Sequence, residues 1–161
     1  MNESGYLTVE YSHTQRAPLC LVLYGFGVFC GLLLSSVDDP VGMALCTSFS
    51  LLFAVLGGAF HYLKVEDNGE ELAIRFGPIP LFGRKLEYAE IQEVEVSRTI
   101  LLDGWGIHYS LRGGWVWNLW GFDCVAIGLR NGGILRIGTN DPENLASFLK
   151  QKTNSSSLAR D

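Results

Sequence analysis

The sequence predicts an α+β protein in which a two-helix transmembrane hairpin precedes a domain of about seven antiparallel strands and a C-terminal helix. The first observation is a pair of long runs without Asp, Glu, Lys or Arg, at residues 17–37 and 40–63. The second is a change, at about residue 64, to short segments in which apolar and polar residues alternate, as in half-buried strands. The third is the helical spacing of apolar residues after Pro142.

The segment before the first run, residues 1–16, is predicted to be cytoplasmic and to contact the later domain. Residues 6–12 alternate, with Leu7, Val9 and Tyr11 on one face. A two-span hairpin returns the chain to the side it left, and a sheet offers unpaired edges there. We therefore expect residues 6–12 to form a strand or extended segment packed on the domain. The alternative is a loose terminus that lies on the membrane surface.

The two apolar runs are long enough to cross a bilayer. They cover 21 and 24 positions, and a hydrocarbon core about 30 Å thick requires roughly 20 residues of helix. We predict a first span at 17–37, a turn at 38–40 and a second span at 41–63. One alternative is a pair of buried helices in a soluble protein. Another, for the first run, is a cleaved signal peptide, which normally has a shorter apolar region after a basic segment.

The basic residues predict the orientation of the hairpin. The turn contains Asp38 and Asp39 and no Lys or Arg. The basic residues nearest the outer ends of the spans are Arg16, Lys64, Arg75, Arg84 and Lys85. Because Lys and Arg near span ends favour the cytoplasmic side, both termini are expected in the cytoplasm. The sequence thus predicts a multi-pass protein of the cell (inner) membrane, with the lipid bilayer as one partner.

Small residues indicate where helices approach each other. Gly27 and Gly31 form a GxxxG pattern in the first run, and Ala54 and Gly58 form a similar pattern of small residues in the second. Such residues let two backbones approach closely in lipid. Two arrangements fit: a seam between the two spans of one chain, and a face for a homo-oligomer through Gly27 and Gly31.

Residues 64–152 are predicted to form the β-domain with its C-terminal helix, and residues 153–161 a flexible tail. The pair Asn68-Gly69 separates two extended runs, and Asn131-Gly132 is expected to form a type I′ hairpin turn. The further segments expected to be extended are 71–76, 85–88, 91–97, 105–109, 115–120, 124–129 and 134–137.

The stretch 129–149 has three glycines ahead of a helix start, which raises the question of a phosphate-binding loop. The glycine order in residues 132–138 matches neither G-x-x-x-x-G-K-[ST] nor G-x-G-x-x-G, and Asp141 and Glu143 would repel an anion. Asp141 is expected to cap the helix, and Pro142 suits its first position. We therefore predict a hairpin followed by a capped helix, and no nucleotide cofactor.

The segment 113–121 is rich in tryptophan and forms, with Arg112, the candidate interaction surface. Trp115 and Trp117 share one face at strand spacing, and Trp120 follows them. Tryptophan is common in binding hot spots and at membrane interfaces as well as in protein cores. Three interpretations stay open: rings in the core of the sheet, contact with the membrane surface, and a groove for a partner.

The layout of short strands and a final helix resembles the pleckstrin-homology-like (PH-like) domains of bacterial membrane proteins, in which two spans commonly precede the domain. The resemblance covers about residues 62–152 and rests on residues 86–94 (LEYAEIQEV), 104–107 (GWGI) and 129–142. It implies a partly open barrel of antiparallel strands, capped by the C-terminal helix. Eukaryotic phosphoinositide-binding members carry basic residues in the first hairpin loop, whereas residues 66–71 (EDNGEE) are acidic, so no phosphoinositide recognition is expected.

Composition and motifs limit the classes of function. The net charge of -5 and the pI near 5.1 argue against a nucleic-acid partner. The Cys and His spacings do not suggest a metal site, and H-E-x-x-H and G-x-S-x-G do not occur. We expect a non-catalytic interaction module without cofactor or metal, which binds a protein or supports an assembly at the cytoplasmic face. The alternatives are a binder of lipid or a small ligand through the Trp-rich segment, and an enzyme acting on a membrane substrate.

Overall fold

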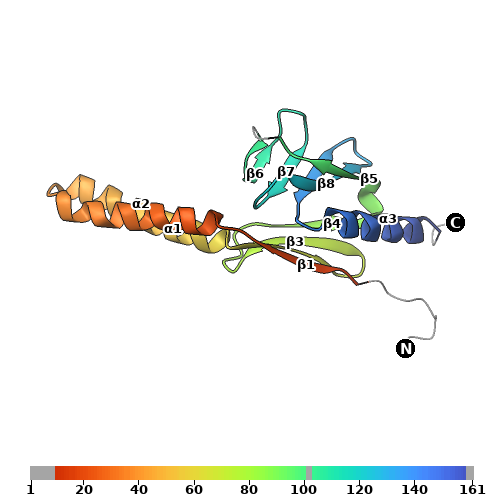
Figure 1. Ribbon diagram of the computed structural model, residues 1–161, viewed down its shortest axis with the longest axis horizontal. Helices are drawn as coiled ribbons and strands as arrows, with labels where there is room; N and C mark the ends of the chain where they lie inside the picture. Colours follow the sequence, from red (N-terminus) through yellow and green to blue (C-terminus); the bar gives the residue numbers. More distant parts are fainter. Residues whose placement is uncertain (1–9, 101–102, 159–161) are drawn as a thin grey trace.

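Two helices project from one end of a two-sheet domain in the computed structural model, which describes residues 10–100 and 103–158, with side chains up to residue 154 (Figure 1). The helices are α1 (Leu19–Leu33), which continues as the short helix η1 (Leu34–Ser36), and α2 (Pro40–Ala59). Both are long and apolar enough to cross a membrane, and few of their residues are buried within the chain. Their 18 and 20 residues correspond to lengths of about 27 and 30 Å.

The helices are shorter than the predicted spans. α1 begins at Leu19, directly after Pro18 at its N-cap. α2 begins at Pro40, where the Asp39 carboxylate accepts the N–H of Gly42 at 2.8 Å, so the turn lies at 37–39. α2 ends at Ala59 because the chain passes almost at once into a strand. Leu63 is therefore part of the sheet and not of the second span.

The seam between α1 and α2 is built on small residues. A Cβ atom at Gly27 would lie 3.2 Å from the carbonyl oxygen of Ser50 and 3.4 Å from the Cβ atom of Phe53. The Ser50 hydroxyl donates a hydrogen bond of 2.9 Å to the Gly27 carbonyl, and Gly31 also faces Ser50. Of the two arrangements that the sequence allowed for Gly27 and Gly31, the chain itself forms the seam within the hairpin.

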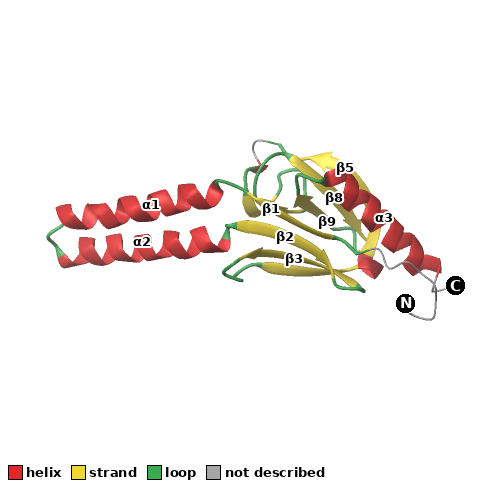
Figure 2. Ribbon diagram, turned by 60° about the horizontal axis from the view of Figure 1, so that its bottom comes forward, coloured by secondary structure: helices red, strands yellow, loops and turns green. Residues whose placement is uncertain are grey.

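The first sheet has the strand order β1-β2-β3-β4, and all its neighbours are antiparallel. Its strands are β1 (Ser12–Arg16), β2 (Tyr62–Asp67), β3 (Glu71–Gly77) and β4 (Gly83–Glu87). β1 precedes α1 and pairs with β2, which follows α2, so both ends of the helical hairpin join one sheet (Figure 2).

The N-terminal segment thus docks on the domain, but its strand covers residues 12–16 and not the predicted 6–12. Because β2 begins just after α2, its pairing partner is the segment just before α1, and Arg16 lies opposite Tyr62. Tyr11 extends the pairing, since its carbonyl accepts the N–H of Asp67 at 2.7 Å. Residues 6–9 of the predicted strand lie outside the described residues.

The second sheet has the order β5-β8-β9-β7-β6. Its strands, which follow the short helix η2 (Tyr88–Glu90), are β5 (Ile91–Arg98), β6 (Gly106–Tyr109), β7 (Trp115–Asn118), β8 (Asp123–Leu129) and β9 (Ile134–Gly138). The described residues thus contain nine strands in two sheets, where about seven antiparallel strands were predicted. β9 folds back on β8 and then lies beside β7, which makes the β7–β9 pair parallel.

The β6–β7 and β8–β9 hairpins have loops of the same construction. A glycine in the left-handed conformation, Gly113 (φ +78°) or Gly132 (φ +82°), donates its N–H at 2.9 Å to the carbonyl of Ser110 or Leu129. Each loop is a type I turn followed by a glycine bulge. Among the described residues only glycines have positive φ, so the prediction of a type I′ turn at Asn131-Gly132 is wrong, although the hairpin itself forms.

The C-terminal helix α3 (Pro142–Leu158) packs against β5, β8 and η2 and places Leu145, Phe148 and Leu149 in the core. The helix continues through residues 153–158, for which a flexible tail was expected. It starts as predicted, after the β8–β9 hairpin. The Asp141 carbonyl accepts the N–H of Leu145 at 3.2 Å, and its carboxylate accepts the side-chain amide of Asn144 at 2.7 Å.

An ion pair fastens α3 to the hairpin between β2 and β3. The Nζ atom of Lys152 lies 2.7 Å from Oδ2 of Asp67, and the Tyr88 hydroxyl donates to Oδ1 of the same carboxylate at 2.8 Å. The Asp67 side chain is almost fully buried in this position. The helix therefore joins the two sheets at the end of the domain opposite the helical hairpin (Figure 2).

Candidate interaction groove

Trp115 and Trp117 share one face of β7 but differ in how deeply they are buried. Trp117 is 8% exposed and packs in the core, with its ring 5.9 Å from that of Phe76 in the first sheet. Trp115 is 47% exposed. The strand spacing therefore predicted that the two rings share a face. It did not predict that the first sheet, through Phe76, covers Trp117 and leaves Trp115 exposed.

Trp115 lines a groove of about 410 Å³ at the open side of the two sheets. This volume falls within the range of roughly 300–1,000 Å³ that is usual for ligand pockets. Tyr109 of β6 lies directly opposite Trp115 in the register, and the two rings pack edge to face with centroids 5.9 Å apart. Around them lie Arg84, Leu129, Asn131, Ile134 and the glycines of the two hairpin loops.

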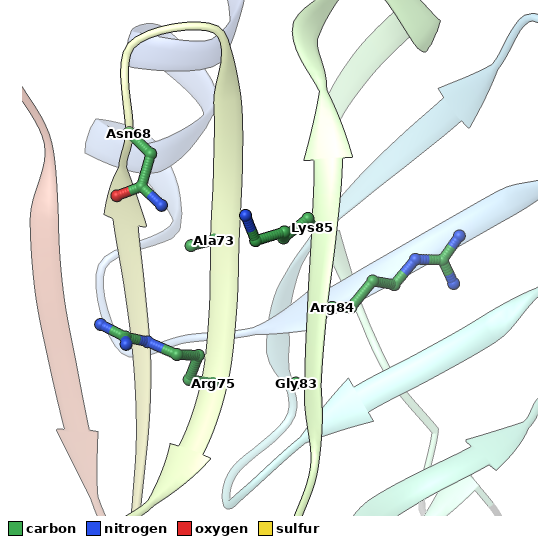
Figure 3. A pocket seen from close by; sticks show the side chains of 6 residues that line it. All are labelled: Asn68, Ala73, Arg75, Gly83, Arg84 and Lys85. Carbon is green, nitrogen blue, oxygen red and sulfur yellow. The ribbon is translucent and has the colours of Figure 1, made fainter. Parts of the chain in front are cut away.

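Arg84 enters the groove from β4 of the first sheet. It lies opposite Ile74 in the register and so shares the inner face, whereas Lys85 lies on the outer face. Figure 3 shows the Arg84 side chain on the side of β4 away from Lys85. Arg84 is half-buried, and within the described part of the chain its guanidinium has no hydrogen-bond or ion-pair partner. Its five N–H donors are therefore available to a ligand.

Close backbone packing forms the wall of the groove. Gly114 has φ +90°, and a Cβ atom there would lie 2.5 Å from the carbonyl oxygen of Ile134. Arg136 of β9 donates from Nη1 to the Gly113 carbonyl at 2.5 Å and so ties the β6–β7 loop to the neighbouring strand. These contacts hold the β6–β7 loop, which joins the strands of Tyr109 and Trp115, against β9.

A second depression, of about 310 Å³, lies on the outer face of the first sheet, between Asn68 and Gly83 (Figure 3). Two of its cations are paired, Arg75 with Glu66 and Lys85 with Glu71. The third is Arg84, which also lines the groove beside Trp115. The hydrogen bond from Lys85 holds the pKa of Glu71 below its usual value. These pairs neutralise the outer face, so an external anion finds a better site at Arg84.

Arg112, which the sequence placed in the candidate surface, fastens two loops. Its guanidinium donates to the carbonyl of Arg98 at 2.9 Å and to Oδ2 of Asp103 at 3.3 Å. Asp103 is buried and also accepts the Ser110 hydroxyl at 2.6 Å and the N–H of Ile100 at 3.1 Å. Burial alone would raise the pKa of Asp103, but these hydrogen bonds outweigh it and lower the pKa below its usual value.

Trp120 lies beyond the other end of β7, away from the groove. Its ring stacks on Trp105 with centroids 4.0 Å apart. Its carbonyl accepts a hydrogen bond of 3.1 Å from the side chain of Gln15 in β1, just before α1. The four predicted surface residues therefore separate: Trp117 lies in the core, Trp115 in the groove, Trp120 near the base of the helices, and Arg112 between two loops.

Sequence reasoning missed Arg84 and Tyr109. The pairing of Tyr109 with Trp115 follows from the short loop around Gly113, so the local pattern held a signal for it. Arg84 is the residue before a predicted strand and has no such signal. It reaches the groove because of the way in which two separate sheets pack, and that packing is not visible in the local sequence.

Comparison with models of protein families, with curated proteins and with solved structures finds no match to this chain. The site is therefore interpreted from its own chemistry. Across residues 10–100 and 103–158, no three His, Cys, Asp or Glu side chains are grouped so as to hold a metal ion. The groove offers a guanidinium, two aromatic rings and close backbone, which are groups that bind and orient a ligand.

Proposed function

We propose that this chain is a non-catalytic, membrane-anchored interaction module that binds an extended segment of a partner protein in the Arg84 groove. The observation that carries the proposal is the half-buried, unpaired Arg84 beside the exposed rings of Tyr109 and Trp115. Burying a guanidinium without a partner is unfavourable, and exposed aromatic rings are a usual feature of binding hot spots. A carboxylate of the partner would pair with the Arg84 guanidinium, and an apolar side chain of the partner would cover the rings of Tyr109 and Trp115.

The helical hairpin supports membrane anchoring. Its exposed side chains are large and apolar along both helices, and a lipid environment would bury them. The pairing of β1 with β2 supports an arrangement in which both ends of the hairpin lie on one side of the membrane. The basic residues near those ends favour the cytoplasmic side.

We favour a protein segment over a lipid as the occupant of the groove. Apolar side chains, among them Leu129 and Ile134, line the groove together with Arg84, and Leu111 in the β6–β7 loop is 83% exposed. A peptide with an acidic residue next to apolar residues matches that combination. An Arg fork pairs with a carboxylate in a bidentate manner, which fixes the orientation of the peptide.

The architecture supports the further proposal that the domain is PH-like. The order of elements, strands followed by a C-terminal helix, is the order that the resemblance implies, although the described residues form nine strands in two sheets and about seven strands were expected. The parallel β7–β9 pair departs from a purely antiparallel barrel. The interaction role proposed above rests on the groove and is independent of this assignment.

A photo-crosslinking amino acid at Leu111, in the β6–β7 loop between the lining residues Tyr109 and Gly113, tests the proposed function in native membranes. We expect crosslinks to an acidic, apolar segment of one protein, identified by mass spectrometry. Arg84→Gln should abolish these crosslinks, whereas Arg84→Lys, which keeps the charge but not the fork, should reduce them. The matched control is the same probe at Glu95, an exposed position on β5.

The outcomes of this experiment separate the alternatives. Crosslinks that map to lipid, and that Arg84→Gln removes, would show that the groove binds a lipid phosphate and not a peptide. Crosslinks that are the same from Leu111 and from Glu95, or that persist in Arg84→Gln, would show that the groove is not a binding site and would contradict the proposal.

A further inference from the structure

The loop between β3 and β4 is apolar and lies against the end of α2. Residues 78–82 (PIPLF) carry no charge, and Leu81 is 53% exposed. A Cβ atom at Gly58, next to the last residue of α2, would lie 2.6 Å from the Cδ1 atom of Ile79. The ring of Phe82 lies 5.3 Å from that of Phe60, which directly follows α2. The loop is thus fixed at the level where α2 ends.

A second apolar surface lies near the start of α1. Trp105, 45% exposed, stacks on Trp120, and Phe122 beside them is also exposed. The hydrogen bond from Gln15 to the Trp120 carbonyl places this surface within four residues of Leu19, the first residue of α1. Four residues of extended chain span at most about 14 Å. Two acidic side chains nearby are paired, Asp103 with Arg112 and Asp123 with Arg98.

The connections between helices and sheet are too short to let the domain move away from the membrane. Two residues, Ala17 and Pro18, separate β1 from α1, and two residues, Phe60 and His61, separate α2 from β2. Both connections join neighbouring strands of one sheet, so the sheet cannot swing freely about either. Figure 1 shows the base of the domain directly against the ends of the helices.

We propose that residues 78–82 together with Trp105, Trp120 and Phe122 form an interfacial footing, which inserts into the headgroup region of the bilayer and holds the domain in one orientation. The proposal rests on the membrane anchoring proposed above. Tryptophan rings are enriched at this depth because they are apolar with one polar N–H. The footing is continuous with the two helices, so the bilayer that surrounds the helices is also its partner. Trp115 and the groove stay in water.

Single-tryptophan variants test the footing, because Trp105 and Trp115 are exposed to nearly the same extent, 45% and 47%. In one variant Trp105 is kept and the other three tryptophans are changed to Phe; in the other Trp115 is kept. Trp120→Phe preserves an aromatic ring in the stack. Both full-length proteins are placed in nanodiscs, with doxyl lipids as the quencher in the membrane and iodide as the quencher in water.

We expect the Trp105 protein to lose most of its fluorescence to a doxyl group near the headgroups and little to iodide, with blue-shifted emission. The Trp115 protein should show the opposite. As an independent reporter, Leu81→Trp in a background without other tryptophans should behave like the Trp105 protein.

Equal and strong iodide quenching at positions 105, 81 and 115, without doxyl quenching, would overturn the footing. The anchor is tested separately, by elution of the protein with the nanodiscs on size exclusion. Co-elution with no doxyl quenching contradicts the footing alone, whereas elution outside the nanodiscs contradicts the membrane anchoring of the proposed function.

Discussion

Tyr11 stacks on Phe148 of α3, with ring centroids 5.3 Å apart and planes at 22°, although the two residues lie near opposite ends of the chain. The Tyr11 hydroxyl also donates to the Asp141 carboxylate at 3.4 Å. Burial, and then the negative charge of Asp141, raises the pKa of Tyr11 above its usual value, because both disfavour the phenolate. The segment before the first helix is therefore part of the folded domain.

Replacement of Tyr11 should measure how much this docking stabilises the domain. Tyr11→Ala removes a half-buried ring and is expected to cost about 2 kcal/mol, or roughly 10 °C in Tm. Tyr11→Phe keeps the stack and loses a long hydrogen bond, so it should cost about 1 kcal/mol or less. Thermal unfolding of the full-length protein in detergent, followed by tryptophan emission, provides the measurement. An unchanged Tm for Tyr11→Ala would contradict the docking.

Asp67 should control the stability of the domain in acid. Burial raises the pKa of this carboxyl, but hydrogen bonds from Lys152, Tyr88 and the N–H of Gly69 outweigh it, and the net pKa is below the usual value. A carboxyl with a lowered folded-state pKa stabilises the fold above its unfolded-state pKa of about 3.9. This stabilisation is lost as the pH falls below that value, through the folded-state pKa.

Asp67→Asn is therefore expected to destabilise the protein by about 1–3 kcal/mol at pH 7 and to flatten the acid limb of the stability profile. Urea unfolding between pH 3 and pH 7 provides the measurement. The matched control is Glu71→Gln in the same hairpin, whose partner Lys85 is exposed, and its effect should stay below about 1 kcal/mol. Parallel pH profiles of wild type and Asp67→Asn would show that the Lys152 pair contributes nothing.

Gly113 and Gly114 provide a matched pair in the wall of the groove. Both have positive φ, +78° and +90°, but a Cβ atom at Gly113 meets no atom within 4 Å, whereas one at Gly114 collides with the Ile134 carbonyl. Gly113→Ala should cost only the left-handed conformation, about 1–2 kcal/mol. Gly114→Ala should cost clearly more and shift the emission of Trp115. Equal losses of Tm in the two variants would mean that the hairpins are not packed as described.

Gly25 and Gly27 provide a similar comparison in α1. A Cβ atom at Gly25 meets no atom within 4 Å, whereas Gly27 faces Ser50 and Phe53 of α2. Gly27→Val should weaken the hairpin by about 1–3 kcal/mol through overpacking, and Gly25→Val should have little effect. Loss of helical circular dichroism during titration with SDS measures both. A larger effect of Gly25→Val would favour a face toward a second copy of the chain.

Cysteine labelling should determine the orientation in the membrane. Asp38→Cys, at the tip of the hairpin, is expected to react with an impermeant maleimide in intact cells. Asn154→Cys, on α3, should react only after lysis, because the domain is expected in the cytoplasm. Each variant needs a background in which the four native cysteines are replaced. Labelling of both positions in intact cells would contradict the two-span hairpin. Labelling of Asn154→Cys alone would show that the hairpin has the opposite orientation.

Elements with a local chemical signature could be predicted from the sequence. The charge-free runs gave the two helices, the Asn-Gly pairs gave two hairpins, and Pro142 marked the first residue of α3. The observed boundaries differ from the predicted ones by a few residues where the next element begins earlier than expected. Leu63, for example, was predicted in the second span but belongs to β2. Period and turn chemistry are properties of nearby residues, which is why they are visible in one sequence.

Relations between distant strands could not be predicted in this way. The insertion of β8 and β9 between β5 and β7 depends on packing across the whole sheet. Trp115 and Trp117 have the same local pattern and opposite exposure, because the first sheet covers only one of them. Arg84 joins the groove for the same reason. Sequence reasoning therefore found one side of the groove, through Trp115, and missed the side that the other sheet supplies.

The pairing of β1 with β2 also orders the steps of biosynthesis. In the proposed membrane topology, β1 leaves the ribosome before either helix and β2 leaves only after both, so β1 stays unpaired until the hairpin has inserted. The two strands can then pair only if both ends of the hairpin lie on the same side of the membrane. A chain that inserted a single helix would leave β1 and β2 on opposite sides, with an exposed sheet edge that chaperones and proteases recognise. In that topology, closure of the first sheet would depend on the insertion of both helices.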